Sequence, residues 1–102
     1  MAFIARWSID VPFGKKDQLF AVLDEWNAWG DAHGWPQARL VVGSIGAPES
    51  RVEEEYRFDS LADLEAAWAK LSDPKVASFR DRIAPFIVPG SPRWEIFRVR
   101  GG

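Results

Sequence analysis

The sequence contains no cysteine, and it has only one histidine and one tyrosine among 102 residues. The absence of cysteine excludes disulfides, thiolate metal sites and a cysteine nucleophile, so packing alone must hold the fold. No segment combines the charged start, apolar centre and small-residue cleavage site of a signal peptide. A chain without cysteine suits a reducing compartment, and we expect a cytoplasmic protein.

An excess of positive charge is also missing. Lysine and arginine number 13 against 15 acidic residues, which gives a formal net charge of -2. Such a chain offers no basic field for nucleic acid or for an anionic membrane surface. No apolar run approaches the ~20 residues of a membrane span. We therefore expect neither a nucleic-acid nor a membrane partner, and the length and 47% hydrophobic content predict one globular domain over residues 1–102.

Hydrophobic patterns predict four strands. Two segments alternate between apolar and polar residues, which is typical of a half-buried strand, and one is apolar at consecutive positions, which indicates a strand covered on both faces. A fourth strand follows the last proline. In chain order these segments are residues 3–9, 38–45, 52–58 and 94–99. The short turn between the second and third of them predicts a hairpin.

Helical spacing of apolar residues predicts helices between these strands. The first helix ends at Gly34, and the second begins after Ser60, whose side chain can cap it. A short third helix runs from Pro74 to Pro85. Residues 86–92 should be extended, because prolines and a glycine exclude a helix there.

The resulting order βαββαβ predicts an α+β fold of the ferredoxin-like type. Right-handed crossovers place the helices on one face of a four-stranded antiparallel sheet, which leaves the other face uncovered. Three strands carry apolar residues on both faces, and an exposed apolar sheet face is an association site. We therefore predict a homodimer that packs sheet to sheet. The apolar pairs are Phe3 with Ile4, Val41 with Val42, and Ile96 with Phe97.

Two local stretches resemble a known superfamily. Residues 56–64, continuing to Trp68, and residues 88–91 before the last strand are similar to segments of the dimeric α+β-barrel proteins, which include NIPSNAP-like and antibiotic-biosynthesis-monooxygenase-like members. The resemblance implies the same fold and a ligand between the helices and the sheet. It leaves the reaction open, because members include oxygenases, cyclases, isomerases and uncharacterised proteins.

Haem-degrading members of that superfamily have an asparagine on the first strand, a tryptophan on the second main helix and a histidine downstream. Only Trp68 matches this pattern, since the single asparagine is Asn27 and the single histidine is His33. We therefore expect no haem. A lone histidine cannot build a metal site, so we expect neither a metal nor another cofactor.

Glu54 is the most informative position in the chain. Strand alternation places it on an apolar face with Val52, Tyr56 and Phe58. Burial would raise its pKa toward that of a general acid or base, whereas an adjacent arginine would lower it. Glu54 is thus either a catalytic carboxylate or a structural anion paired at the rim.

Three further side chains are candidate catalytic groups, each with a structural alternative. Tyr56 could donate a hydrogen bond to a substrate oxygen, or only satisfy its own hydroxyl. Arg6 could hold a ligand carboxylate or enolate, or form a salt bridge with the side of the strand that carries Glu53 and Glu55. His33 could face the ligand, or lie exposed at the end of its helix.

The chain is rich in tryptophan, with six in 102 residues. Flat apolar rings suit aromatic or polycyclic ligands, although tryptophan also fills cores and dimer interfaces. The candidate ligand-binding residues are Trp7, Trp26, Trp68 and Phe58.

Two functions follow as hypotheses. The first is a cofactor-independent enzyme of the oxygenase, cyclase or isomerase type that acts on a small hydrophobic aromatic or polyketide-like molecule. The second is a non-catalytic homodimer of the NIPSNAP-like type that binds a ligand or serves as a structural subunit.

Overall fold

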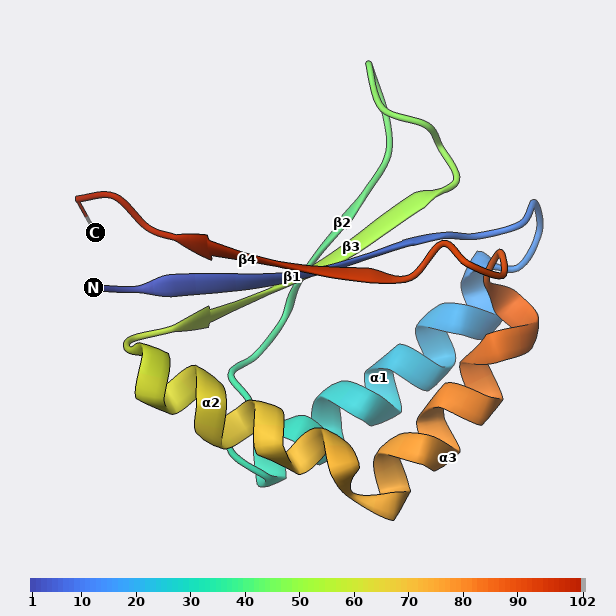
Figure 1. The fold of residues 1–102 in the computed structure, drawn as a ribbon. Helices are drawn as coiled ribbons and strands as arrows, with labels where there is room; N and C mark the ends of the chain where they lie inside the picture. The colour runs from blue at the N-terminus through green and yellow to red at the C-terminus, as the bar shows by residue number, and fades with distance from the viewer. Residues whose placement is uncertain (102) are drawn as a thin grey trace.

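The fold is described by a computed structural model that covers residues 1–101. One antiparallel sheet has the strand order β2-β3-β1-β4, so the first strand lies in the centre beside the third and the last (Figure 1). The strands are β1 (Phe3–Asp10), β2 (Arg39–Val42), β3 (Arg51–Phe58) and β4 (Arg93–Arg98).

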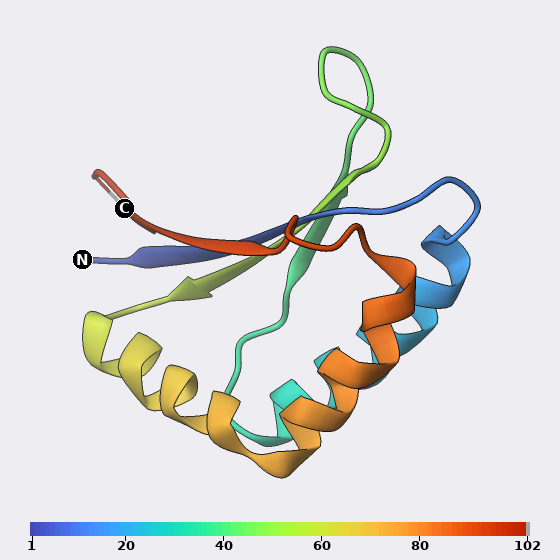
Figure 2. The same cartoon turned by 45° about the vertical axis from the view of Figure 1, so that its right-hand side comes forward.

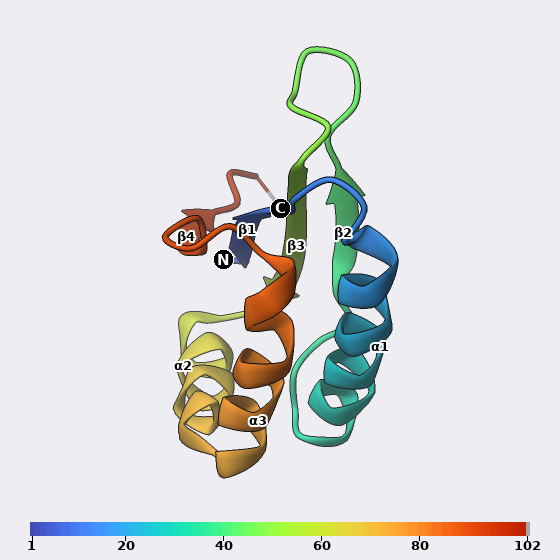
Figure 3. The same ribbon diagram turned by 90° about the vertical axis from the view of Figure 1, so that its right-hand side faces the viewer.

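Three helices cover one face of the sheet (Figures 1 and 2). They are α1 (Lys16–Ala32), α2 (Leu61–Ala69) and α3 (Pro74–Ile83), and short 3-10 turns follow α2 (Lys70–Ser72) and α3 (Ala84–Phe86). From the side, α1 lies under the β2 edge and α2 under the β4 edge (Figure 3). This arrangement confirms the predicted ferredoxin-like α+β fold.

The capping and stop residues that the sequence predicts lie at the ends of the helices. The Ser60 hydroxyl accepts a hydrogen bond from the backbone N–H of Asp63 at 3.1 Å, which caps α2. Pro74 is the first residue of α3, after the capping residue Asp73. Gly34 follows α1 with φ of +88°, a left-handed conformation that suits glycine at a helix end. These caps set the ends of the helices that cover the sheet.

Two predicted boundaries are wrong. The second strand is shorter than the predicted 38–45, because the chain turns back after Gly43: a Cβ there would lie 1.7 Å from the Pro48 carbonyl oxygen. Leu40 and Val42 lie in this edge strand and are each 41% exposed. The predicted extended segment 86–92 begins one residue too early, since residue 86 still belongs to a 3-10 turn. It is also interrupted by a turn in which the Ser91 backbone N–H donates to the Val88 carbonyl oxygen.

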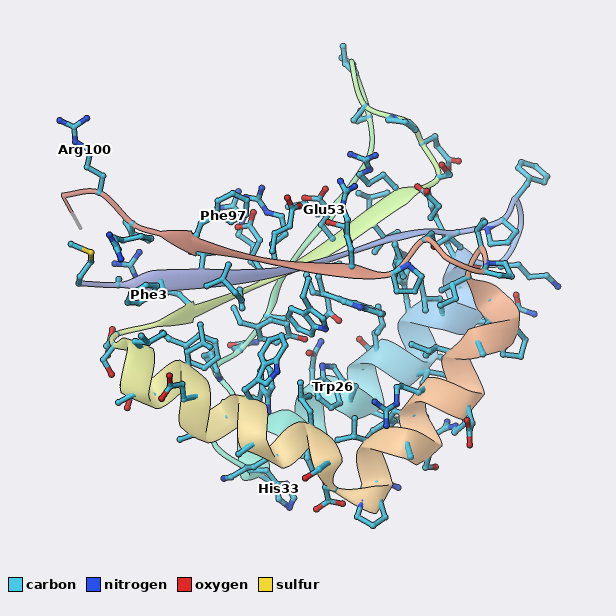
Figure 4. All side chains as sticks on the ribbon, in the orientation of Figure 1. Phe3, Trp26, His33, Glu53, Phe97 and Arg100 are labelled. Carbon is cyan, nitrogen blue, oxygen red and sulfur yellow. The ribbon has the colours of Figure 1, made fainter. Side chains whose placement is uncertain are left out.

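The core lies between the sheet and the helices. Alternation on β1 and β3 directs one set of side chains toward the helices, where Ala5, Ile9 and Val52 are almost completely buried. The opposite set forms the outer face, where Glu53 and Phe97 point away from the helices (Figure 4). Within residues 1–101, no helix is both long and apolar enough to cross a membrane.

Candidate functional site

A cavity of about 360 Å³ lies between the helix-facing side of the sheet and the helices α1 and α3. A volume of this size falls within the range of ~300–1,000 Å³ that is typical of small-molecule sites. Its wall is mainly aromatic and aliphatic, with Glu54 as the one carboxylate among its lining residues. The aromatic residues of the wall are Trp7, Trp26, Tyr56, Phe79 and Trp94.

Strand register brings Glu54 to this cavity. On β3 it lies directly between Trp7 of β1 and Leu40 of β2, on the face that the helices cover. Its exposed fraction is 0%. A carboxylate in such a place normally meets a cation, but no basic side chain in residues 1–101 forms an ion pair with it.

The environment of Glu54 favours its protonated form. Burial raises its pKa to about 7, and the negative charge of Asp24 adds to the effect. The Asn27 amide and the Tyr56 hydroxyl approach the carboxylate and lower the pKa, but neither meets a Glu54 oxygen with hydrogen-bond geometry. Burial outweighs both, so Glu54 can exchange a proton near neutral pH.

Tyr56 lies next to Glu54 on the same face of β3. Its hydroxyl oxygen accepts a hydrogen bond of 2.6 Å from the indole N–H of Trp26, which comes from α1. Burial, followed by the charge of Glu54, raises the pKa of Tyr56 well above its usual range. The phenol therefore keeps its proton, and that proton is available to an acceptor in the cavity.

The six tryptophans form one connected cluster around this site. Trp26 stacks on Trp29 with ring centroids 5.5 Å apart and meets Trp35 edge-on at 5.7 Å. Trp94 continues the cluster to Trp68 at 4.9 Å and to Trp7 at 6.3 Å. Packed indole rings restrict one another's rotamers, so the aromatic wall of the cavity is held rigid.

Of the sequence-predicted residues, Glu54, Tyr56, Trp7 and Trp26 line the cavity together. Arg6 does not, because β1 directs it to the outer face. There its guanidinium binds the Glu55 carboxylate at 2.6 Å and lies 3.6 Å from that of Glu53. The salt-bridge interpretation of Arg6 is confirmed.

The other predicted residues do not line the cavity. His33 stacks on Trp29 at 4.2 Å, and its Nδ1–H donates to the Trp29 carbonyl oxygen at 2.7 Å, at the far side of the helix layer (Figure 4). Phe58 belongs to the buried core, and Trp68 packs against that core from behind the cavity wall.

Three contributors were missed by the sequence reasoning. Trp94 reaches the cavity because it lies opposite Trp7 in the sheet, which only the register between β1 and β4 reveals. Asn27 adjoins Glu54, and its position one turn after Leu23 on α1 was a usable signal. Arg80 lines the cavity from α3, and its position one turn after Val76 was a signal of the same kind.

No group of three or more histidine and acidic side chains within residues 1–101 is arranged to hold a metal ion. The polar groups on the cavity wall are instead a carboxyl, a phenol and two guanidinium groups, which suit proton transfer and anion binding.

Comparison with known proteins yields a fold but no sequence relative. No protein-family model and no curated protein match the chain. Among solved structures, a NIPSNAP family protein with unknown function from Agrobacterium tumefaciens is 22% identical with a TM-score of 0.78, and the match covers 99% of this chain and 91% of that one.

Two further solved structures extend this likeness. A putative antibiotic biosynthesis monooxygenase from Nitrosomonas europaea is 10% identical with a TM-score of 0.74, over 98% of this chain and 91% of that one. SnoaB, a cofactor-independent oxygenase from Streptomyces nogalater, is 10% identical with a TM-score of 0.73, over 99% and 95%. The chain therefore has the ferredoxin-like fold of the NIPSNAP-like and antibiotic-biosynthesis-monooxygenase-like structures, as its sequence resemblance implied.

Proposed function

We propose that this protein is a small cofactor-independent enzyme of the oxygenase, cyclase or isomerase type, which acts on a hydrophobic aromatic or polyketide-like compound. The observation that carries the proposal is Glu54: a fully buried carboxyl on the wall of an aromatic cavity, with a pKa raised to about 7. A general base is most effective when its pKa lies near the working pH.

The proposed chemistry begins with proton abstraction. The Glu54 carboxylate takes a proton from a carbon acid or phenol of the bound compound and becomes a neutral carboxylic acid. The electron pair left on the substrate forms an enolate or phenolate, whose oxygen accepts a hydrogen bond from the Tyr56 hydroxyl. Trp26 strengthens that donor, because its N–H already binds the phenol oxygen. Arg6 and His33 have no part in this step, since neither lines the cavity.

The solved structures support this proposal at the level of the fold. One of them is described as a cofactor-independent oxygenase and another as a putative monooxygenase, whereas the NIPSNAP family proteins among them have no stated activity. A fold of this kind hosts many functions, so the argument for enzyme chemistry rests on Glu54 and Tyr56.

The alternative is a non-catalytic ligand-binding protein of the NIPSNAP-like type. The rigid tryptophan wall favours it, because stacked indole rings bind an aromatic molecule whether or not a proton moves. In that case Glu54 would contribute to neither binding nor turnover, and its removal would leave affinity unchanged.

Deuterium uptake into 2-tetralone tests the proposal. This two-ring ketone has acidic protons next to its carbonyl, and NMR in D2O follows their exchange directly. We expect the protein to accelerate exchange with an apparent pKa near 7, since the ionised form of Glu54 is the base. Replacing Glu54 with Gln should lower the rate by roughly 100-fold or more.

Glu55→Gln is the matched control. It removes the same carboxylate from the next residue, but on the outer face, where Glu55 binds Arg6. We expect its exchange rate to equal that of the unaltered protein. Saturable binding of 2-tetralone without any acceleration of exchange would favour the non-catalytic alternative, and equal rates in both variants would remove Glu54 from the mechanism.

We further propose that the protein is a cytoplasmic homodimer that packs through the outer sheet face. Phe97 is an apolar side chain that is 40% exposed on this face. Arg6 on the same face already pairs with Glu53 and Glu55, so a second copy could cover the face without burying an unpaired charge. Native mass spectrometry should give twice the protomer mass. Phe97→Lys should reduce it to the protomer mass, and a monomeric unaltered protein would contradict the proposal.

A further inference from the structure

Arg80 lines the cavity, and the proposed function gives its positive charge no role. It lies on α3 one turn after Val76, on the side of the helix that faces the sheet, and both residues line the cavity. Unlike Glu54, it is exposed. Arg80 therefore borders the cavity at its solvent-facing mouth, whereas Glu54 borders it where water does not reach.

Neighbouring cations all have partners. Arg82 binds Glu25 of α1 through two hydrogen bonds of 3.0 and 2.5 Å, and Lys75 lies over the Phe79 ring at 5.2 Å. Arg93, the second guanidinium on the cavity wall, lies 3.6 Å from Glu95.

Arg80 differs from these cations. Within residues 1–101 its guanidinium has no carboxylate, aromatic or hydrogen-bond partner. An arginine without a partner at the rim of a mainly apolar cavity is a group that a planar anion can bind through two parallel hydrogen bonds.

We propose that the natural ligand is an aromatic acid: one or two rings that fill the tryptophan-lined interior, with a carboxylate that binds Arg80 at the mouth. This inference rests on the proposed function, because it assigns a substrate class to the same cavity. The volume fits, since cavities of about 150 Å³ hold a single benzene ring and this one has about 360 Å³.

The separation of charges supports this orientation of the ligand. A carboxylate placed beside Glu54 would add a negative charge to a site that already feels Asp24 and has no ion-pairing cation. At the mouth, the same carboxylate keeps its contact with water and meets Arg80. The reactive part of the ring system then reaches Glu54 and Tyr56.

Calorimetric titration with two probes tests the assignment. The probes are 2-naphthoate, a two-ring carboxylate, and 2-naphthamide, a neutral molecule of nearly the same shape. We expect the unaltered protein to bind 2-naphthoate more tightly. Arg80→Gln should weaken 2-naphthoate binding by roughly 10-fold and leave 2-naphthamide binding unchanged, because only the carboxylate meets the guanidinium.

Arg82→Gln is the matched control, since it removes the same charge from the same helix two residues away, where Arg82 binds Glu25. It should preserve the preference for 2-naphthoate. If the Arg80 and Arg82 variants preferred 2-naphthoate over 2-naphthamide equally, the assignment of Arg80 would be overturned. In that case, binding of 2-naphthamide that shifts the indole NMR signals of Trp7 and Trp94 would still support the cavity as the ligand site. Failure of both probes to bind the unaltered protein would overturn this assignment and the ligand cavity beneath it.

Discussion

Three consecutive glutamates of β3 lie on opposite faces of the sheet and differ in their burial and in their ion pairs. On the outer face, Glu53 and Glu55 share the Arg6 guanidinium and stay in contact with water. On the inner face, Glu54 is fully buried beside tryptophan rings and forms no ion pair. A strand that alternates between faces thus gives one residue type two chemistries: a structural anion outside and a titratable acid inside.

The largest expected difference between the faces is in the pH dependence of stability. The pKa of Glu54 is 4.5 in the unfolded chain and about 7 in the folded one. A raised pKa in the folded state means that the native form binds the extra proton, so the stability that Glu54 contributes is complete below pH 4.5 and is lost as the pH rises through 7. A difference of this size corresponds to about 3 kcal/mol.

Urea denaturation from pH 4 to 8 measures this effect. The free energy of unfolding of the unaltered protein, minus that of Glu54→Gln, should fall by about 3 kcal/mol across the range. Asp24→Asn should move the transition to lower pH, because the charge of Asp24 helps to raise the pKa of Glu54. A difference that does not vary with pH would mean that folding leaves the pKa of Glu54 unchanged, and the contrast between the faces would disappear.

The next largest effect concerns the hydrogen bond behind Glu54. Tyr56→Phe removes the acceptor of the Trp26 indole N–H, which is buried and binds at 2.6 Å. A buried donor without a partner costs about 1–3 kcal/mol, so we expect the free energy of unfolding to fall by about 2 kcal/mol.

Urea denaturation at pH 7 measures the cost of Tyr56→Phe, with Trp26→Phe and the double variant completing a cycle. Trp26→Phe also loses the packing of its indole on Trp29 and Trp35, so we expect the double variant to lose less than the sum of the two single losses, by the energy of the shared hydrogen bond. Strictly additive losses would show that the bond does not stabilise the inner face.

Strand alternation alone predicted much of this contrast. It placed Glu54 and Tyr56 on one face of the third strand, with Glu53 and Glu55 on the other. That result depends only on the period of two, which survives errors of a residue or two in the strand ends. The salt bridge of Arg6 was one of two alternatives, and the register of β1 against β3 decides it.

What sequence could not provide was the alignment between elements. Trp94 joins the cavity wall through its register with Trp7, which depends on long-range pairing that no local pattern records. His33 continues the apolar spacing of the helix but is the capping residue just after α1, where its ring stacks on Trp29. Arg80 is exposed on a short helix, and only the packed helices reveal that it borders a cavity.

The smallest expected effect lies on the outer face, at the ion pair between Arg6 and Glu55. In one protomer the Arg6 side chain is 32% exposed, so Glu55→Gln should lower the free energy of unfolding by about 1 kcal/mol or less in dilute solution, and by less again in 1 M NaCl. If a second copy covers this face, the cost should grow with protein concentration, because unfolding then includes dissociation of the dimer. Urea denaturation at several protein concentrations separates the two contributions. A fall of more than about 3 kcal/mol in the free energy of unfolding of Glu55→Gln, at every protein concentration, is the size expected for a fully buried ion pair. It would show that water is excluded from the outer face as it is from the inner face, so that the two faces differ only in the partners of their glutamates.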